Sequence, residues 1–300
     1  MNQEPAGQRQ LPTDGLYAVV LGIAQDAGLP HVGCRCARCL AAQGDPAAAE
    51  YAASMAIVDA RRRPNSVWLV DATPDIKFQL NYLAPALGPH PLIPGRLRQP
   101  DGLFLTHAHM GHTAGLAQLG PEGMNVGDLP VYASKGLLTV LQETALWRPL
   151  LGNLRLFALA AGVAVDLAPG LSITPLEVPH RDELGAGTFA FRVQGPDGAL
   201  LYVPDIDDWG RWPLAREAIA GVDVILADAS FHSADELAGR PPVAHPLVAD
   251  TVAFFADLPG RLILTHLNHT NRLLDRESAS RAALAAQGVT VARFGQIIPL

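Results

Sequence analysis

Three histidines within six residues constrain the fold of this chain more than any other feature of its sequence. His107, His109 and His112 directly follow the apolar run 103–105, which is expected to be a buried strand, and a helical pattern begins after them. Side chains two residues apart project to the same side of an extended segment, so the rings of His107 and His109 should face together. Imidazoles gathered at the carboxyl end of a strand are typical of a metal site in an α/β protein.

Further side chains that can bind a metal stand at the ends of other expected strands. His180 follows strand 171–178, Asp205 follows strand 199–203, and His266 follows strand 261–265. Zn²⁺ binds imidazole nitrogen and carboxylate oxygen, and a catalytic site keeps one position for water, whose pKa falls toward ~7 on the metal. A single histidine is ordinarily a surface or packed residue, whereas this set predicts a metal centre assembled from separate strand ends.

The three cysteines of the chain are clustered. Cys34, Cys36 and Cys39 have the spacing Cys-x-Cys-x-x-Cys. Their odd number is unsuited to a disulfide framework, and a disulfide within so tight a cluster would be strained. Three thiolates this close, completed by a fourth ligand, are typical of a structural zinc site. Free buried thiols are the alternative.

Composition and charge narrow the class of protein. Of the 300 residues, 49% are hydrophobic and 17% are charged, which is typical of a compact globular chain. The net charge of −7 disfavours nucleic acid and anionic membranes as partners, and the basic run 61–63 is expected to be a solvated hairpin tip. No apolar run reaches the roughly 18 residues of a membrane helix, and the N-terminus lacks a secretory signal, so a cytoplasmic protein is expected.

The order of elements predicts two halves that each begin β-rich and become mixed α and β. Residues 1–15 are expected to be a loose leader, and residues 16–300 one domain with a zinc loop at 31–40 and an excursion at 232–245. Two such halves favour two sheets packed face to face with helices outside. The expected strands are 17–22, 54–58, 66–71, 102–106, 130–133, 171–178, 189–193, 199–203, 222–226, 261–265 and 289–294; the expected helices are 40–50, 135–147, 247–257 and 275–287; and 84–101 is expected to be a Pro-rich loop.

The histidine pattern resembles that of the metallo-β-lactamase-fold superfamily, whose signature is His-x-His-x-Asp-His followed by later His, Asp and His ligands. The resemblance covers nearly the whole chain and implies an α/β (α+β) fold, a four-layer αββα sandwich. It also implies the ligand set, in which His107, His109 and His180 hold one metal, His112 and His266 hold a second, and Asp205 bridges them.

The chain departs from this signature at one position, because Gly111 stands where the pattern has Asp. Glycine offers no ligand, so the second site loses a carboxylate. Two histidines and one carboxylate remain there, which is the ligand set of many non-haem iron sites. The active site is therefore expected to be a mononuclear Zn²⁺ site, a weakened dinuclear site, or an Fe²⁺ site.

A closer resemblance is to the pyrroloquinoline quinone biosynthesis protein B family, carried by the segments 22–30, 69–76 and 266–271. It implies oxidative tailoring of a Glu-Tyr-derived precursor, although many relatives look like hydrolases of unknown substrate. The expected function is thus a metal-dependent enzyme that activates water or dioxygen against a small polar or peptide-derived substrate. The alternatives are a generic metallo-hydrolase for phosphodiesters or esters, and a binding or carrier protein whose centre has decayed. A homodimer is among the expected assembly states.

The resemblance also suggests the fourth ligand of the cysteine site. A related phosphodiesterase branch, that of the carbon–phosphorus lyase pathway, has the same cysteine spacing, completed by a histidine three residues after the last active-site histidine. The corresponding residue is His269, and the implied structural Zn²⁺ set is Cys34, Cys36, Cys39 and His269. His31 is the less favoured alternative.

Three polar residues are further candidates for roles around the metal. Asp182 is expected to be an outer partner of a ligand or a proton carrier, with a solvated loop as the alternative. His245 is expected to reach the site as a substrate or proton-transfer group, or else to begin a helix. Asp71 is expected to brace the metal loop through hydrogen bonds. No P-loop, Gly-x-Gly-x-x-Gly or Ser nucleophile elbow is found, so no nucleotide cofactor is expected.

Overall fold

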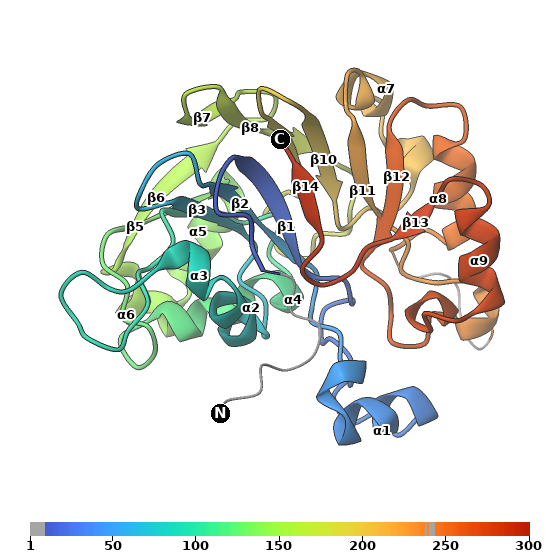
Figure 1. The fold of residues 1–300 in the computed structure, drawn as a ribbon, viewed down its shortest axis with the longest axis horizontal. Helices are drawn as coiled ribbons and strands as arrows, with labels where there is room; N and C mark the ends of the chain where they lie inside the picture. The colour runs from blue at the N-terminus through green and yellow to red at the C-terminus, as the bar shows by residue number, and fades with distance from the viewer. Residues whose placement is uncertain (1–9, 238, 240–243) are drawn as a thin grey trace.

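Two seven-stranded sheets face each other, with helices on their outer faces (Figure 1). The structure is a computed structural model that describes residues 10–237, 239 and 244–300. The first sheet has the order β14-β1-β2-β3-β4-β5-β6 and the second β13-β12-β11-β10-β9-β8-β7. The predicted αββα sandwich is therefore confirmed.

The strands of the first sheet are β1 (Leu16–Gly22), β2 (Ser54–Asp59), β3 (Ser66–Val70), β4 (Gly102–Phe104), β5 (Leu129–Ser134), β6 (Leu154–Leu159) and β14 (Ile297–Pro299). Those of the second are β7 (Val165–Ala168), β8 (Leu171–Glu177), β9 (Phe189–Gln194), β10 (Ala199–Val203), β11 (Val224–Asp228), β12 (Arg261–Thr265) and β13 (Thr290–Val291). The helices are α1 (Ala37–Gly44), α2 (Ile76–Tyr82), α3 (Ala84–Leu87), α4 (Met110–Thr113), α5 (Lys135–Glu143), α6 (Arg148–Leu151), α7 (Ala215–Ile219), α8 (Val248–Phe255) and α9 (Ala279–Ala285).

The central strands are apolar throughout because both of their faces are covered. All seven residues of β1 are buried. Ala18 and Val20 point into the core that also holds Phe191 of the second sheet. Val19 alternates with them and packs in the other core, with Leu80 of α2. Successive side chains of a strand point to opposite faces of the sheet. When both faces are buried, all residues of the strand are apolar, and the sequence shows one continuous apolar run.

The topology brings several strand ends to one edge of the sandwich. The strands β3 to β6 are parallel to one another, and so are β10 to β13. The carboxyl ends of parallel strands meet at one edge, which is where open α/β folds place their sites. Asp71 follows β3, His107 follows β4, Asp205 follows β10 and His266 follows β12. A backbone hydrogen bond from Phe189 N to Thr106 O, 2.9 Å long, ties the two sheets together beside this edge.

Several elements differ from the sequence-based expectations. The strands β6, β7 and β14 were not expected, and β14 pairs with β1 from the opposite end of the chain. The expected strand 289–294 is shortened to β13, and the Pro-rich segment 84–101 contains the short helix α3. Residues 1–9 of the expected leader and residues 238 and 240–243 of the expected excursion lie outside the described residues, while Leu11 is buried.

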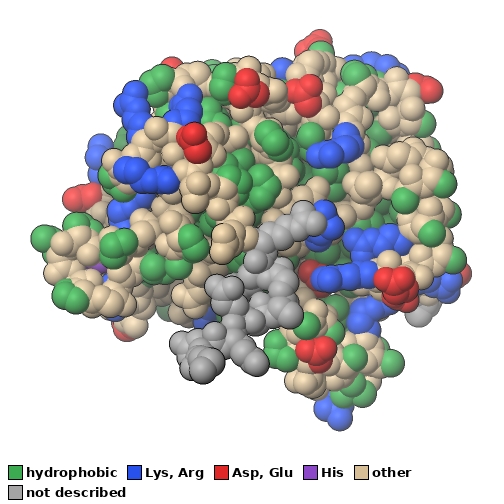
Figure 2. Space-filling view, in the orientation of Figure 1, with side chains coloured by type: hydrophobic (Ala, Val, Ile, Leu, Met, Phe, Trp, Pro, Cys, Tyr) green, Lys and Arg blue, Asp and Glu red, His purple; other side chains and the backbone are tan. Residues whose placement is uncertain are grey.

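The surface carries charges of both signs. In the view of Figure 2, Lys and Arg side chains gather beside the protruding segment that contains α1, with acidic side chains among them. Four arginines, Arg261, Arg276, Arg281 and Arg293, line a cavity of about 440 Å³.

No helix in the described part of the chain has the length and apolar character needed to cross a bilayer.

We expect Tyr17→Phe to lower the free energy of unfolding by about 1 kcal/mol, because the buried hydroxyl of Tyr17 donates a 3.0 Å hydrogen bond to Pro12 O. The matched control is Tyr202→Phe, since the Tyr202 hydroxyl is buried without a partner among the described residues. Its removal should leave stability unchanged or slightly raised. Urea unfolding of both variants measures the difference, and equal losses would contradict the prediction.

Candidate metal centre

Three histidines and one aspartate form a first group of inward-facing ligand atoms. His109 Nδ1 lies 2.9 Å from His107 Nε2 and 3.3 Å from His180 Nε2. Asp205 Oδ1 lies 3.8 Å from His107 Nε2 and 3.7 Å from His180 Nε2. All four ligand atoms are within 4.8 Å of one another. Residues from three separate parts of the chain thus direct their ligand atoms to one place, as metal ligands do.

A second group adjoins the first through Asp205. His112 Nε2 lies 3.2 Å from Asp205 Oδ2, and His266 Nε2 lies 3.4 Å from Asp205 Oδ1. His112 is in α4 and His266 directly follows β12, with φ of 57°. The two oxygens of Asp205 therefore face both groups, and the structure brings together all six of the active-site ligands predicted from the sequence.

The outward nitrogens of four of these histidines are hydrogen-bonded to a polar side chain, and that of His180 lies near a carboxylate without a hydrogen bond among the described residues. The pairs are His107 Nδ1 and Thr106 Oγ1 at 2.9 Å, His109 Nε2 and Glu183 Oε2 at 3.0 Å, His112 Nδ1 and Asp71 Oδ2 at 2.7 Å, His180 Nδ1 and Asp207 Oδ1 at 3.1 Å, and His266 Nδ1 and Ser230 Oγ at 3.0 Å. Partners of this kind fix the tautomer and orientation of imidazoles that bind a metal through their other nitrogen.

Asp71 connects two of these pairs. Its buried carboxylate accepts hydrogen bonds from Thr106 N at 2.8 Å and from Thr106 Oγ1 at 2.9 Å, in addition to its contact with His112. The backbone of Asp71 has φ of 69°, a left-handed conformation that is uncommon outside glycine. The residue at the end of β3 thus fixes both ends of the loop that carries the three clustered histidines.

The electrostatics of the centre favour a neutral His107 and a charged Asp205. Burial, together with positive charge on His112, lowers the pKa of His107 well below its usual range. Burial would raise the pKa of Asp205, but His266 and His112 outweigh it and hold that pKa well below its usual range. For His112, the carboxylates of Asp205 and Asp71 outweigh burial and raise its pKa. Metals bind a deprotonated carboxylate and a free imidazole lone pair, so Asp205 and His107 are in the binding form and a metal ion would displace the proton of His112.

The inward atoms of the second group lack hydrogen-bond partners. Among the described residues, the buried atoms His112 Nε2, His266 Nε2 and Asp205 Oδ2 have none. A buried polar atom without a partner costs about 1–3 kcal/mol. A bound cation would satisfy all three atoms at once, so the residues present fit a metal ion.

His245 lies beside the centre. Its Nδ1 is 2.7 Å from Asp228 Oδ2, and its ring centroid is 5.1 Å from that of His266 and 5.3 Å from that of His180. Burial opposes a positive charge on His245, but Asp228 outweighs it and raises the pKa to about 9. The ring also lines a cavity of about 510 Å³, together with Asp207 and Trp209.

Asp182 and its neighbour Glu183 have different contacts. The Asp182 carboxylate accepts hydrogen bonds from the backbone of Leu184 and Gly187, so it shapes its own loop. Glu183, which the sequence reasoning did not single out, contacts His109. The order of residues in the loop could not distinguish these two carboxylates, because only the turn decides which of them points at the histidine.

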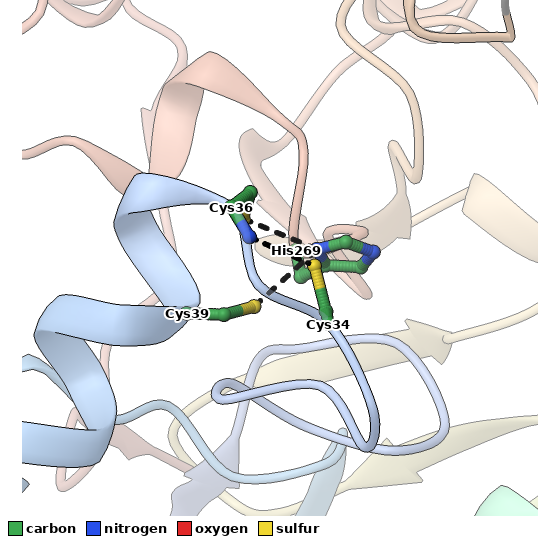
Figure 3. A group of neighbouring side chains, drawn as sticks. All are labelled: Cys34, Cys36, Cys39 and His269. Carbon is green, nitrogen blue, oxygen red and sulfur yellow. Dashed lines mark hydrogen bonds between the residues drawn. The ribbon is translucent and has the colours of Figure 1, made fainter.

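The three cysteines and His269 form a separate group of ligand atoms at the start of α1, drawn in Figure 3. His269 Nδ1 is 3.6 Å from Cys39 Sγ and 4.0 Å from Cys36 Sγ, and the ligand atoms of these residues and Cys34 are within 4.8 Å of one another. Three sulfurs and one imidazole nitrogen fit the tetrahedral set of a structural Zn²⁺.

His269 comes from the segment after β12, so the cluster joins two distant parts of the chain. Arg38 of α1 reinforces this junction by donating a 2.7 Å hydrogen bond to His269 O. His31 lies against the His269 ring, with centroids 4.5 Å apart, but its Nδ1 faces Val32 O and it is not part of the four-residue group. The geometry therefore favours His269 over His31 as the fourth ligand.

The sequence and fold have clear relatives. Residues 67–267 match the β-lactamase superfamily domain. Coenzyme PQQ synthesis protein B of Methylorubrum populi is 30% identical over 95% of this chain and 100% of its own. The chain belongs to the coenzyme PQQ synthesis protein B branch of the β-lactamase superfamily.

Solved structures agree with this family. The crystal structure of Zn²⁺-bound PqqB from Methylobacterium extorquens is 26% identical, with a TM-score of 0.81 over 95% of this chain and 100% of that one. A diphosphatase from the PhnP family is 20% identical, with a TM-score of 0.69 over 95% of this chain and 97% of that one, and shows the shared fold alone. The resemblance inferred from the sequence is therefore confirmed.

We expect Cys36→Ala and His269→Ala each to remove about one zinc per chain and to lower the melting temperature, because a structural zinc contributes folding free energy. His31→Ala is the matched control and should keep its zinc. Elemental analysis and thermal melting of the three variants test the assignment, which fails if His31→Ala loses zinc while His269→Ala retains it.

Asp71→Asn is expected to weaken metal binding at the histidine centre by roughly 10–100-fold, because an amide replaces the carboxylate that orients His112 and Thr106. The control is Asp101→Asn, whose carboxylate accepts from Val67 N at the start of β3, away from the centre. Chelator competition measures the affinities. Equal weakening in both variants would indicate a general loss of fold rather than a role at the centre.

Proposed function

We propose that this protein is a metal-dependent enzyme that hydrolyses a small polar substrate at the histidine centre. The observation that carries the proposal is that five histidines point one ring nitrogen toward Asp205. The other nitrogen of each of these rings lies near a polar side chain that orients it. A bound Zn²⁺ would lower the pKa of its water toward ~7 and supply hydroxide at neutral pH.

The ligands divide into two sets. His107, His109 and His180 would hold one ion, His112 and His266 a second, and Asp205 would contact both. Thr106, Glu183, Asp71, Asp207 and Ser230 keep the rings in place, so little reorganisation is needed when substrate arrives.

His245 is suited to deliver a proton. Asp228 accepts a hydrogen bond from its Nδ1, and this carboxylate raises the pKa of His245, which favours the protonated ring. Its Nε2–H is then free to protonate the leaving group, so that hydrolysis adds hydroxide to one fragment and a proton to the other. Substrate would approach through the cavity lined by His245, Asp207 and Trp209. Asp182 would act by holding the loop that presents Glu183.

A second candidate is oxidation with dioxygen at an Fe²⁺ centre. Two observations favour it: His112, His266 and Asp205 form a set of two histidines and one carboxylate, and the relatives are named for the synthesis of coenzyme PQQ. This reaction would consume dioxygen, whereas hydrolysis would proceed without it.

We expect His109→Ala to lower the metal-dependent rate by roughly 100-fold or more, because the loss of an outer partner alone costs about 10–100-fold. His90→Ala, at a histidine outside the centre, is the control. Protein purified without oxygen or added metal is analysed for zinc and iron, then assayed with esters, thioesters and phosphodiesters with and without oxygen.

Each outcome of this experiment assigns a function. Zinc lost with His109→Ala and turnover without oxygen support hydrolysis. Iron lost with His109→Ala and oxygen uptake support the oxidative reaction. Metal retained only at the cysteine site, with no turnover, overturns the proposal in favour of a binding or carrier protein.

A further inference from the structure

The space beside Gly111 is filled by another residue. A Cβ atom built on Gly111 would lie 2.2 Å from Asp26 Oδ1 and 2.6 Å from Asp26 Cα, far inside van der Waals contact. No side chain at position 111 is therefore compatible with Asp26 where it stands. Gly111 stands in place of the aspartate of the superfamily signature, and its lack of a side chain leaves space for the carboxylate of Asp26.

The Asp26 carboxylate faces the second group of histidines. Its Oδ1 lies 3.9 Å from His112 Nε2, and one ligand atom each of Asp26, His112 and His266 lie within 4.8 Å of one another. The two histidine Nε2 atoms are buried and lack hydrogen-bond partners among the described residues. Two unpartnered nitrogens and a carboxylate thus converge on the same place.

The backbone holds Asp26 beside His266. Gln25 N donates to Leu267 O at 2.9 Å, and Leu267 N donates to Ile23 O at 2.7 Å, so the residues that precede Asp26 pair with the residue that follows His266. Asp26 has φ of 31°, which is uncommon outside glycine. Among the described residues no hydrogen-bond donor to its carboxylate is found, and the side chain is 41% exposed, so its oxygens are free to bind a cation.

We propose that Asp26 is a ligand of the second active-site ion, together with His112, His266 and Asp205. This inference rests on the proposed metal-dependent function and completes its centre. The second site then has two imidazoles and two carboxylates, a set that suits zinc, iron or manganese. Gly111 is the counterpart of Asp26 rather than a mark of decay.

The first test compares Asp26→Asn with Asp128→Asn. Asparagine keeps the shape of the side chain and tolerates the left-handed backbone, but it lacks the charge. Asp128 is an exposed aspartate with φ of 49° outside the centre, so it controls for charge and conformation. Elemental analysis, chelator competition and the absorption spectrum of the Co²⁺-loaded protein are measured for both variants and the parent.

We expect Asp26→Asn to weaken binding of one active-site ion by roughly 100-fold or more and to change the Co²⁺ spectrum, since even an outer partner is worth about 10–100-fold. The first active-site ion and the zinc of the cysteine site should be kept. Asp128→Asn should match the parent. His112→Ala, which removes a ligand of the same ion, is the positive control for loss of that ion.

The second test builds a side chain at position 111. Gly111→Ala adds only the Cβ atom, which collides with both the side chain and the Cα of Asp26, so this variant should displace Asp26 and weaken the second ion. A second ion that Gly111→Ala holds with the affinity of the parent would contradict the role of Asp26.

The inference and the proposed function fail in different ways. A parent protein with two active-site ions whose affinities are unchanged in Asp26→Asn overturns the role of Asp26 only. A parent with a single active-site ion also overturns that role and leaves the metal-dependent function standing. A parent with metal only at the cysteine site overturns both.

Discussion

The charged carboxylate of Asp205, buried among the imidazoles of six histidines, constrains the rest of the site. Asp205 is 2% exposed, and the positive potential of the surrounding histidines keeps it ionised despite the loss of water. Such a group is tolerable only if the rings around it cannot turn away, because a buried charge without partners is costly. The outer contacts of the rings, with Asp71 the most connected among them, therefore stabilise the centre as much as they orient it.

The sandwich supplies these contacts from both of its sheets. Asp71 and His107 come from the first sheet, and Asp205, Asp228 and His266 from the second. Because parallel strands end at one edge in each sheet, side chains far apart in the sequence meet without long loops. The junction of α1 with the segment after β12, seen in Figure 3, extends this arrangement, since His269 stands three residues beyond His266. The site is thus a property of the whole fold and of no single loop.

Local patterns in the sequence were sufficient to predict most of the fold and most of the candidate site residues. Continuous apolar runs predicted the central strands, and the histidine and cysteine spacings, together with the family resemblance, predicted both ligand sets. Three edge strands were not predicted. β6 and β7 are partly exposed and each contains a charged residue, and β14 is three residues long and depends on β1 at the other end of the chain. Asp26 and Glu183 were not predicted as site residues for a related reason. Each lies near a histidine of the centre only after folding, and neither belongs to a recognisable spacing in the sequence.

The mutual exclusion of Asp26 and a side chain at position 111 also bears on how such chains change over generations. A chain that exchanges one arrangement for the other by single substitutions must first carry both carboxylates, which collide, or neither, which leaves His112 and His266 with Asp205 as their carboxylate. Under the proposed role of Asp26, each intermediate would bind the second ion less well than either end point. A glycine within the histidine loop is therefore compatible with a complete metal centre when a carboxylate is supplied from another part of the chain.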